Sequence, residues 1–119
     1  MKLLVCGGRD LDENKVYRKL LEYGYGKPLF TEIIHGGATG ADSAAGLYAR
    51  MNDIKETVFP VSSDDWKRYG KYAGIRRNRI MLTEGQPDAI LAFTGGNGTA
   101  NMMQIGRAAG IPVHELECK

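Results

Sequence analysis

Apolar residues along the chain follow two alternating patterns. Short apolar runs bounded by glycine and other turn residues alternate with longer stretches in which apolar positions recur every three or four residues. The first pattern is typical of buried strands and the second of amphipathic helices, and their alternation indicates βαβ units with a parallel sheet. The predicted strands are residues 3–6, 32–35, 57–61, 89–93 and 113–116.

The predicted strands differ in how apolar they are. Residues 3–6 and 89–93 are continuously apolar, as expected of central parallel strands that are buried on both faces. Residues 113–116 are mixed, which suits a strand at the edge of the sheet.

Two helices are predicted from an apolar stripe with a clear end. Residues 16–21 carry one stripe after Asp12, and Gly24 is placed to end that helix. Residues 102–109 carry another, which stops at Gly110 and the proline that follows.

Two further helices are expected between the remaining strands. A stripe over residues 41–51 is preceded by Thr39, with Asp42 three residues later, which predicts a capping box. Residues 62–74 are less regular, and we expect a structured loop or short turn there, leading into a helix over residues 71–84.

Length, composition and charge fit one soluble α/β domain over residues 1–119. The proportions of hydrophobic (43%) and charged (25%) residues are ordinary. The net charge of +2 is too small to draw the chain to nucleic acid or an anionic membrane by charge alone. No apolar run has the length of a signal peptide or a membrane span, so we expect a cytoplasmic protein with no membrane partner.

The sequence gives no sign of a metal or another cofactor. Cys6, inside an apolar run, and Cys118 have no metal-site spacing, so we expect two free thiols, with Cys6 in the core. No cluster of His, Cys, Asp and Glu has the spacing of metal ligands, and no serine elbow with a histidine and an aspartate is present.

Glycine is in excess, with 16 residues, and it gathers after three predicted strands. Because the carboxyl ends of parallel strands share one edge of the sheet, these turns converge beside the point where the first strand meets its neighbour. Glycine turns and helix N-termini together suit a phosphate. The turns are Gly7-Gly8, Gly36-Gly37-Ala38-Thr39-Gly40 and Gly95-Gly96-Asn97-Gly98-Thr99.

A structural explanation for these glycines stays open, because tight strand-to-helix turns also need glycine. That explanation accounts better for one turn than for three that converge. Neither longer turn is a Walker P-loop or a G-x-G-x-x-G fingerprint. We therefore expect a nucleotide that is bound by neither of these common motifs.

Arginines supply the expected cationic partners. Arg77 shares a helical face with Ala73 and Met81, so we expect it to point toward the sheet and meet an anion, with an internal ion pair as the alternative. Arg76 and Arg79 are expected in solvent.

Four other residues have both a functional and a structural interpretation. Arg9, directly after the first glycine pair, suits a bidentate phosphate clamp or a surface position. Asp42 suits a ribose hydroxyl or the capping box. Trp66 suits stacking on a base or packing beside two tyrosines, and His35 suits a proton shuttle or a local hydrogen bond.

Three motifs together resemble a known family. In order and spacing, HGGATGAD, W-x2-YG-x2-AG-x2-RN-x2-M and GGNGTANM are similar to the SLOG superfamily, named for the Smf and lonely-guy proteins, and to its short branch related to YspA and YpsA. The resemblance runs from residue 3 to about residue 113. It implies a Rossmann-like, three-layer α/β domain with a five-stranded, mostly parallel sheet and a site for nucleotides or nucleotide-derived ligands.

The enzymatic relatives in that superfamily are the lonely-guy phosphoribohydrolases, which cleave the N-glycosidic bond of a nucleoside monophosphate. Their R-K-x-x-M motif resembles residues 77–81 and carries its arginine over to Arg77. Their P-G-G-x-G-T-x-x-E motif resembles residues 94–102, so the phosphate-binding part is retained while the glutamate falls on Met102. Glycosidic hydrolysis benefits from a carboxylate beside the sugar, which methionine cannot supply and Asp42 would have to replace.

Three hypotheses follow. The first is a protein that binds a phosphorylated nucleotide-derived ligand as a sensor. The second is a nucleotide N-glycosidase with Asp42 and Arg77 as candidate catalytic residues. The third is single-stranded nucleic-acid binding, as in the Smf/DprA relatives, which the small net charge disfavours. Because related proteins pair, a homodimer or higher homo-oligomer is a further expectation from the resemblance.

The same predicted site serves the first two hypotheses. Its ligand-binding residues are Gly7, Gly8, Arg9, Gly36, Gly37, Thr39, Gly40, Asp42, Trp66, Arg77, Asn78, Gly95, Gly96, Asn97, Gly98 and Thr99.

Overall fold

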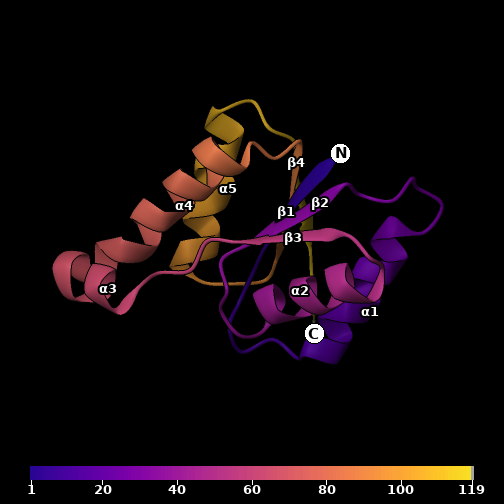
Figure 1. The fold of residues 1–119 in the computed structure, drawn as a ribbon, viewed down its shortest axis with the longest axis horizontal. Helices are drawn as coiled ribbons and strands as arrows, with labels where there is room; N and C mark the ends of the chain where they lie inside the picture. The colour runs from indigo at the N-terminus through magenta and orange to yellow at the C-terminus, as the bar shows by residue number, and fades with distance from the viewer. Residues whose placement is uncertain (119) are drawn as a thin grey trace.

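The structure is a computed structural model that describes residues 1–118. Its centre is a sheet of five parallel strands in the order β3-β2-β1-β4-β5 (Figure 1). The strand order reverses between β1 and β4, which is the switch point of a Rossmann-like sheet. This confirms the predicted α/β class. The strands are β1 (Lys2–Cys6), β2 (Glu32–His35), β3 (Lys55–Val58), β4 (Ala89–Phe93) and β5 (Val113–Leu116).

Helices cover both faces of this sheet and make the predicted three layers. Two helices, α1 and α2, contact each other on one face, and α4 and α5 contact each other on the other (Figure 1). A shorter helix, α3, extends beyond one end of the sheet. The helices are α1 (Glu13–Gly24), α2 (Ala41–Met51), α3 (Ser63–Tyr69), α4 (Ala73–Gly85) and α5 (Asn97–Ala108).

Alternation along the central strands divides the core between the two faces. Leu3 and Val5 of β1 are buried with residues of α1 and α2, whereas Leu4 and Cys6 are buried with residues of α4 and α5. β4 is buried along its whole length, as expected of a central strand. β5 is only partly buried and lies at an edge, as its mixed composition predicted.

The third strand lies earlier than the predicted residues 57–61. β3 occupies Lys55–Val58. Glu32 in β2 forms an ion pair with Lys55 and accepts a hydrogen bond from the Thr57 hydroxyl. Phe59 makes one last backbone hydrogen bond to His35, and Pro60 then has no N–H to continue the ladder. The prediction missed this register because an exposed edge strand with polar residues has no apolar pattern.

The stretch predicted as a loop before the third helix contains a helix of its own. Ser62 caps α3 by accepting a hydrogen bond from the backbone of Asp65 at 3.0 Å. A single 3-10 turn at Gly70–Tyr72 then leads into α4, which begins two residues later than predicted. Because α3 has no buried residue, it shows no apolar stripe along its sequence.

The helices do not have the character of membrane spans. None of those within residues 1–118 combines the length and the hydropathy that crossing a bilayer requires.

Substitutions at two neighbouring leucines of α1 test which face of this helix packs in the core. Leu20 is 1% exposed and Leu21 is 43% exposed. We expect Leu20→Ala to lower the free energy of unfolding by about 2–5 kcal/mol, because it leaves a cavity against the sheet. Leu21→Ala is the matched control and should change it by about 0.5 kcal/mol or less. Urea denaturation measures both, and equal effects would contradict the packing of α1.

Candidate functional site

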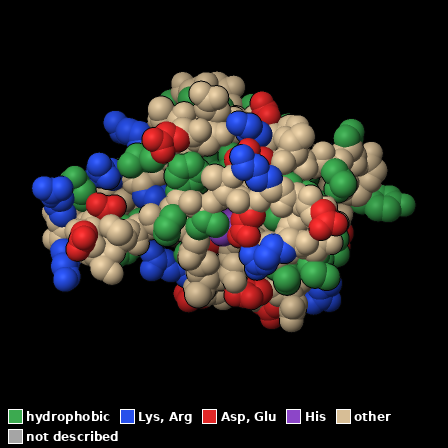
Figure 2. Space-filling model, viewed as in Figure 1, with side chains coloured by type: hydrophobic (Ala, Val, Ile, Leu, Met, Phe, Trp, Pro, Cys, Tyr) green, Lys and Arg blue, Asp and Glu red, His purple; other side chains and the backbone are tan. Residues whose placement is uncertain are grey.

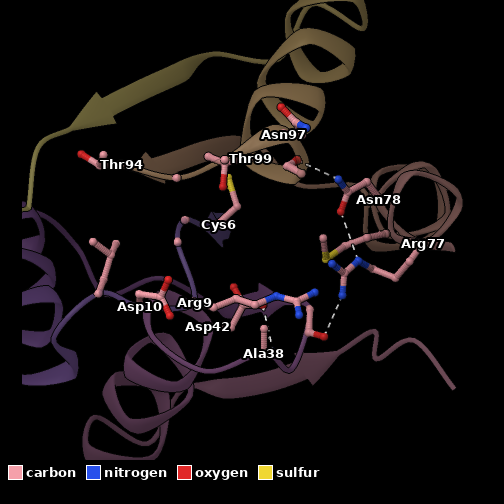
Figure 3. Close-up of a pocket in the computed structure, with 18 residues that line it drawn as sticks. Cys6, Arg9, Asp10, Ala38, Asp42, Arg77, Asn78, Thr94, Asn97 and Thr99 are labelled. Carbon is pink, nitrogen blue, oxygen red and sulfur yellow. Dashed lines mark hydrogen bonds between the residues drawn. The ribbon is translucent and has the colours of Figure 1, made fainter. Parts of the chain in front are cut away.

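A cavity of about 550 Å³ opens at the carboxyl edge of the sheet, beside the switch point between β1 and β4 (Figure 3). Thr94, Asn97 and Thr99 lie on one side of it, and Arg9 and Asp42 lie on the opposite side. The predicted site residues that line this cavity are Gly7, Gly8, Arg9, Gly36, Asp42, Arg77, Asn78, Gly95, Gly96, Asn97, Gly98 and Thr99. The structure therefore brings the three glycine turns together.

Four predicted residues lie elsewhere. Gly37, Thr39 and Trp66 line a second cavity of about 310 Å³ that adjoins the first. Gly40 lines neither of these cavities. Its backbone has φ 71° and packs against the carbonyl of Gly8, where a side chain would overlap, so its role is in the turn itself.

Six residues of the main cavity were not among the predicted ones. Five of them adjoin a predicted residue or follow it closely in sequence, and the sixth, Met81, lies one helical turn after Arg77. Proximity in sequence to the predicted residues is thus the signal that could have identified most of these six. The six are Cys6, Asp10, Leu11, Ala38, Thr94 and Met81.

Arg77 points inward from α4, as its helical face predicted. Its Nη1 donates to the carbonyl of Gly36 at 2.8 Å and to that of Phe59 at 3.2 Å. A side chain on Gly36 would overlap the guanidinium, so Arg77 keeps this position only beside a glycine. Within residues 1–118, Arg77 has backbone carbonyls and the Asn78 side chain as hydrogen-bond partners, and it forms no ion pair.

Positive charge concentrates around Arg77. Burial lowers the pKa of its guanidinium, Asp42 acts in the opposite direction, and the nearby Arg9 lowers the pKa further. The two side chains enter from opposite directions, and their guanidinium groups point toward each other (Figure 3). An anion between the two guanidinium groups would relieve their mutual repulsion.

More basic residues gather at the neighbouring end of the molecule. Lys67 and Arg68 in α3 and Lys71 in the following turn lie in a region where Lys and Arg side chains cluster on the surface (Figure 2). The first turn of α3 also carries Asp64 and Asp65, so acidic side chains lie among these basic ones.

Asn78 holds two helices in register at the cavity. Its amide nitrogen donates to the carbonyl of Gly98 at 3.0 Å and to Asn101 Oδ1 at 3.1 Å, while its oxygen accepts from Arg77 Nε at 3.1 Å. Asn78 is 4% exposed, so these bonds occupy a buried amide. They fix the start of α5 relative to Arg77.

The turn after β2 uses its own backbone N–H groups. Gly37 donates to His35 Nδ1 at 3.0 Å, and Ala38 donates to Asp42 Oδ2 at 3.1 Å. The predicted capping box is therefore wrong. Gly40 is the residue at the cap, Asp42 reaches back past it to Ala38, and the Thr39 hydroxyl donates to the carbonyl of Arg9.

Asp42 is the buried carboxyl group of the cavity, with 6% of its surface exposed. Burial raises its pKa, and hydrogen bonds from the turn together with the charge of Arg77 offset this only in part. Asp42 is thus able to accept hydrogen bonds from a ligand and to exchange a proton closer to neutral pH than an ordinary aspartate.

Three helices begin at this edge, and they differ in how their first N–H groups are used. Asp12 caps α1 by accepting from the backbone of Asn14 and Lys15. In α2, Ala41 donates to the carbonyl of Gly8, and Asp42 places a negative charge in the first turn. In α5, the cap residue Gly96 has no side-chain bond, and the first turn holds no acidic residue. Of these three, α5 presents the N-terminus most open to an anion.

His35 is satisfied locally, one of its two predicted interpretations. Its Nδ1 accepts from Gly37, so its Nε2 carries the hydrogen that bonds to Glu56 Oε2 at 2.6 Å. Arg50 donates to the other oxygen of Glu56 at 2.7 Å. Burial acts to raise the pKa of Glu56, but the hydrogen bonds from His35 and Arg50 and the charge of Arg50 outweigh it and hold the pKa below its usual value.

Two residues limit the chemistry of the cavity. Burial raises the pKa of the Cys6 thiol to about 12, so at neutral pH it is not a thiolate nucleophile. Met102, at the position of the glutamate in the lonely-guy motif, is fully buried beneath the sheet with Leu4 and Ile90 and does not line the cavity.

Comparison with known proteins assigns the chain to a family. The model of the YspA, cpYpsA-related SLOG family matches residues 1–69, which include the turn after β2 and extend through α3. The chain belongs to this family. The family match confirms the resemblance that the motifs predicted.

A known relative is similar to this chain beyond residue 69 as well. Gene 61 protein of Mycobacterium phage D29 is 34% identical over 119 aligned positions, which cover 94% of this chain and 93% of the phage protein. The similarity therefore includes α4, which carries Arg77, and the glycine turn before α5.

The Glu56 network gives stability a specific dependence on pH. The folded-state pKa of Glu56 lies below its usual value of 4.5, so its contribution is complete above that value and is lost as pH falls through the folded pKa. We expect Glu56→Gln to cost about 1–3 kcal/mol at neutral pH. Urea denaturation at decreasing pH should show this difference from wild type shrinking in the acid range. The exposed Glu84→Gln is the control, and a difference that stays constant with pH would contradict the assignment.

Proposed function

We propose that the protein binds a phosphorylated, nucleotide-derived ligand in the 550 Å³ cavity, with the phosphate at the start of α5. The observation that carries the proposal is the uncapped N-terminus of α5 facing a cavity that also holds Arg9 and Arg77. Free N–H groups, a favourable helix dipole and two guanidinium groups are the features that bind phosphate in proteins.

Of the two turns that were predicted to bind the phosphate, the structure favours one. The turns at residues 36–40 and 95–99 were both predicted to bind it, but in the first turn the N–H groups of Gly37 and Ala38 already bond to His35 and Asp42. The second turn leads directly into the uncapped helix. This difference supports residues 95–99 as the phosphate site and the 36–40 turn as the wall beside it.

The rest of the ligand follows from the opposite wall and from the family. Membership in the SLOG family is compatible with a nucleotide-related ligand. Asp42 lies across the cavity from α5, where a carboxylate suits the hydroxyl groups of a ribose. A cavity of this size lies within the range of small-molecule sites, which is about 300–1,000 Å³.

Binding without turnover is the function that we propose, and N-glycosidic hydrolysis is the alternative. The buried Met102 supports binding, because the glutamate of the related hydrolases has no counterpart at that position. The raised pKa of Asp42 in the cavity supports the alternative, because such a group can act as an acid or base.

One experiment separates the two functions. The wild-type protein is incubated with nucleoside monophosphates, NAD and cyclic nucleotides, and thermal stability and released base are measured on the same samples. Stabilisation without base release is the expected result. Base release that Asp42→Asn abolishes would establish the hydrolase instead, and no stabilisation by any of these compounds would overturn both functions.

A charge at the start of α5 tests the phosphate site itself. We expect Asn97→Asp to stabilise the free protein by about 0.3–1 kcal/mol, because an acidic residue favours a helix N-terminus. The same change should weaken binding of a stabilising nucleotide roughly tenfold, because it repels the phosphate. Arg77→Ala should also weaken binding, but it removes the bonds to Gly36 and Phe59 as well.

The matched control for Asn97→Asp lies on the same helix. Gln104→Glu makes the same change of charge at an exposed position outside the cavity, and it should leave affinity unchanged. Thermal shift and isothermal titration give stability and affinity for both variants. Equal affinities for Asn97→Asp and wild type would move the phosphate away from α5.

A further inference from the structure

The second cavity, of about 310 Å³, shares a wall with the proposed phosphate cavity. Arg9, Gly36, Ala38 and Arg77 line both, so the two spaces meet across these four residues. A ligand that reaches from one cavity into the other passes between the two arginines and the turn after β2.

The two cavities have different chemistry. The first has the open N-terminus of α5 and suits an anion, as argued above. The second adds Gly37, Thr39, Pro60, Val61 and Trp66 to the shared wall, and no acidic side chain lines it. Its lining therefore combines two arginines with an aromatic ring and a short apolar segment, and guanidinium groups and aromatic rings both stack on planar bases.

Trp66 is partly exposed in this second cavity. It is 43% exposed, and Arg9 Cζ lies 5.9 Å from its ring centroid. Within residues 1–118 this contact with Trp66 is the only cation–π or ion-pair contact of the Arg9 side chain. Arg9 is therefore able to reach both an aromatic ring on Trp66 and an anion in the first cavity.

We propose that the ligand is a nucleotide bound across both cavities, with its phosphate at α5, its ribose beside the turn after β2 and its base stacked on Trp66. This inference rests on the proposed phosphate site and adds a selectivity to it. The site takes phosphates that carry an aromatic base and discriminates against sugar phosphates and inorganic phosphate, which leave the second cavity empty.

The chain offers a direct probe, because Trp66 is its single tryptophan. Adenosine and guanosine monophosphates, ribose 5-phosphate and inorganic phosphate are titrated into the wild-type protein. Tryptophan fluorescence is excited at the red edge of its absorption, where the bases absorb little, and affinity is measured in parallel by isothermal titration. We expect the nucleotides to quench Trp66 and to bind about 5- to 150-fold more tightly than ribose 5-phosphate, which is the range that stacking of one base gives.

Variants separate stacking from a general effect on the fold. Trp66→Ala should lower the affinity for the nucleotides by about tenfold or more and leave that for ribose 5-phosphate unchanged. Trp66→Phe keeps an aromatic face and should retain most of the affinity. Tyr72→Ala removes an aromatic that is 60% exposed on the next turn and lines neither cavity, so it should change nothing. Melting temperatures of all variants establish that they fold.

The outcomes for the two proposals differ. If nucleotides bind at α5 but leave Trp66 fluorescence unchanged, and Trp66→Ala binds as wild type does, the phosphate site stands and the base site is overturned. Equal affinity for ribose 5-phosphate and the nucleotides has the same meaning. If none of the probes binds, the proposed function fails and this inference fails with it.

Discussion

The arrangement of the carboxyl edge depends on two adjacent residues of α4. Arg77 bonds to backbone carbonyls after β2 and β3, and Asn78 bonds to the first turn of α5. Together they connect both sides of the switch point through one helix, using buried or half-buried polar groups that have few alternative partners. The width of the cavity is therefore set by side chains of a helix that is itself outside the glycine turns. The glycines make the space, and this arginine and asparagine fix its size.

The distribution of helix caps explains why the site is asymmetric. Parallel topology brings the starts of α1, α2 and α5 to one edge, so each could in principle bind an anion. Asp12 closes the first, and Asp42 with the Gly8 carbonyl occupies the second. Negative charge therefore lies on one side of the edge and an open helix start on the other. A ligand with a phosphate at one end and hydroxyl groups in its middle matches this polarity.

Part of this architecture could be predicted from the sequence, and the physical reasons differ from element to element. β1 and β4 were predicted because strands buried on both faces are apolar throughout, and the convergence of the glycine turns follows from parallel topology. The inward orientation of Arg77 followed from its helical face. The limits of β3 and the existence of α3 were missed because exposed elements have no apolar period. The capping box was wrong because the backbone of Gly40, which moves the helix start, cannot be read from residue types. For the same reason, the sequence shows which turns converge but not which of their N–H groups are already bonded.

The burial of Met102 also determines what a substitution at this position would do to the protein. Its side chain is one of the fully buried members of the core between the sheet and α4 and α5. A glutamate introduced there by a single substitution would carry its carboxylate into a dry, apolar cluster, where an unpaired charge is strongly unfavourable. A carboxylate could therefore replace Met102 only if α5 rotated or its apolar neighbours shrank. The packing of the core, and not the glycine turn before α5, thus decides which side chains position 102 can accept.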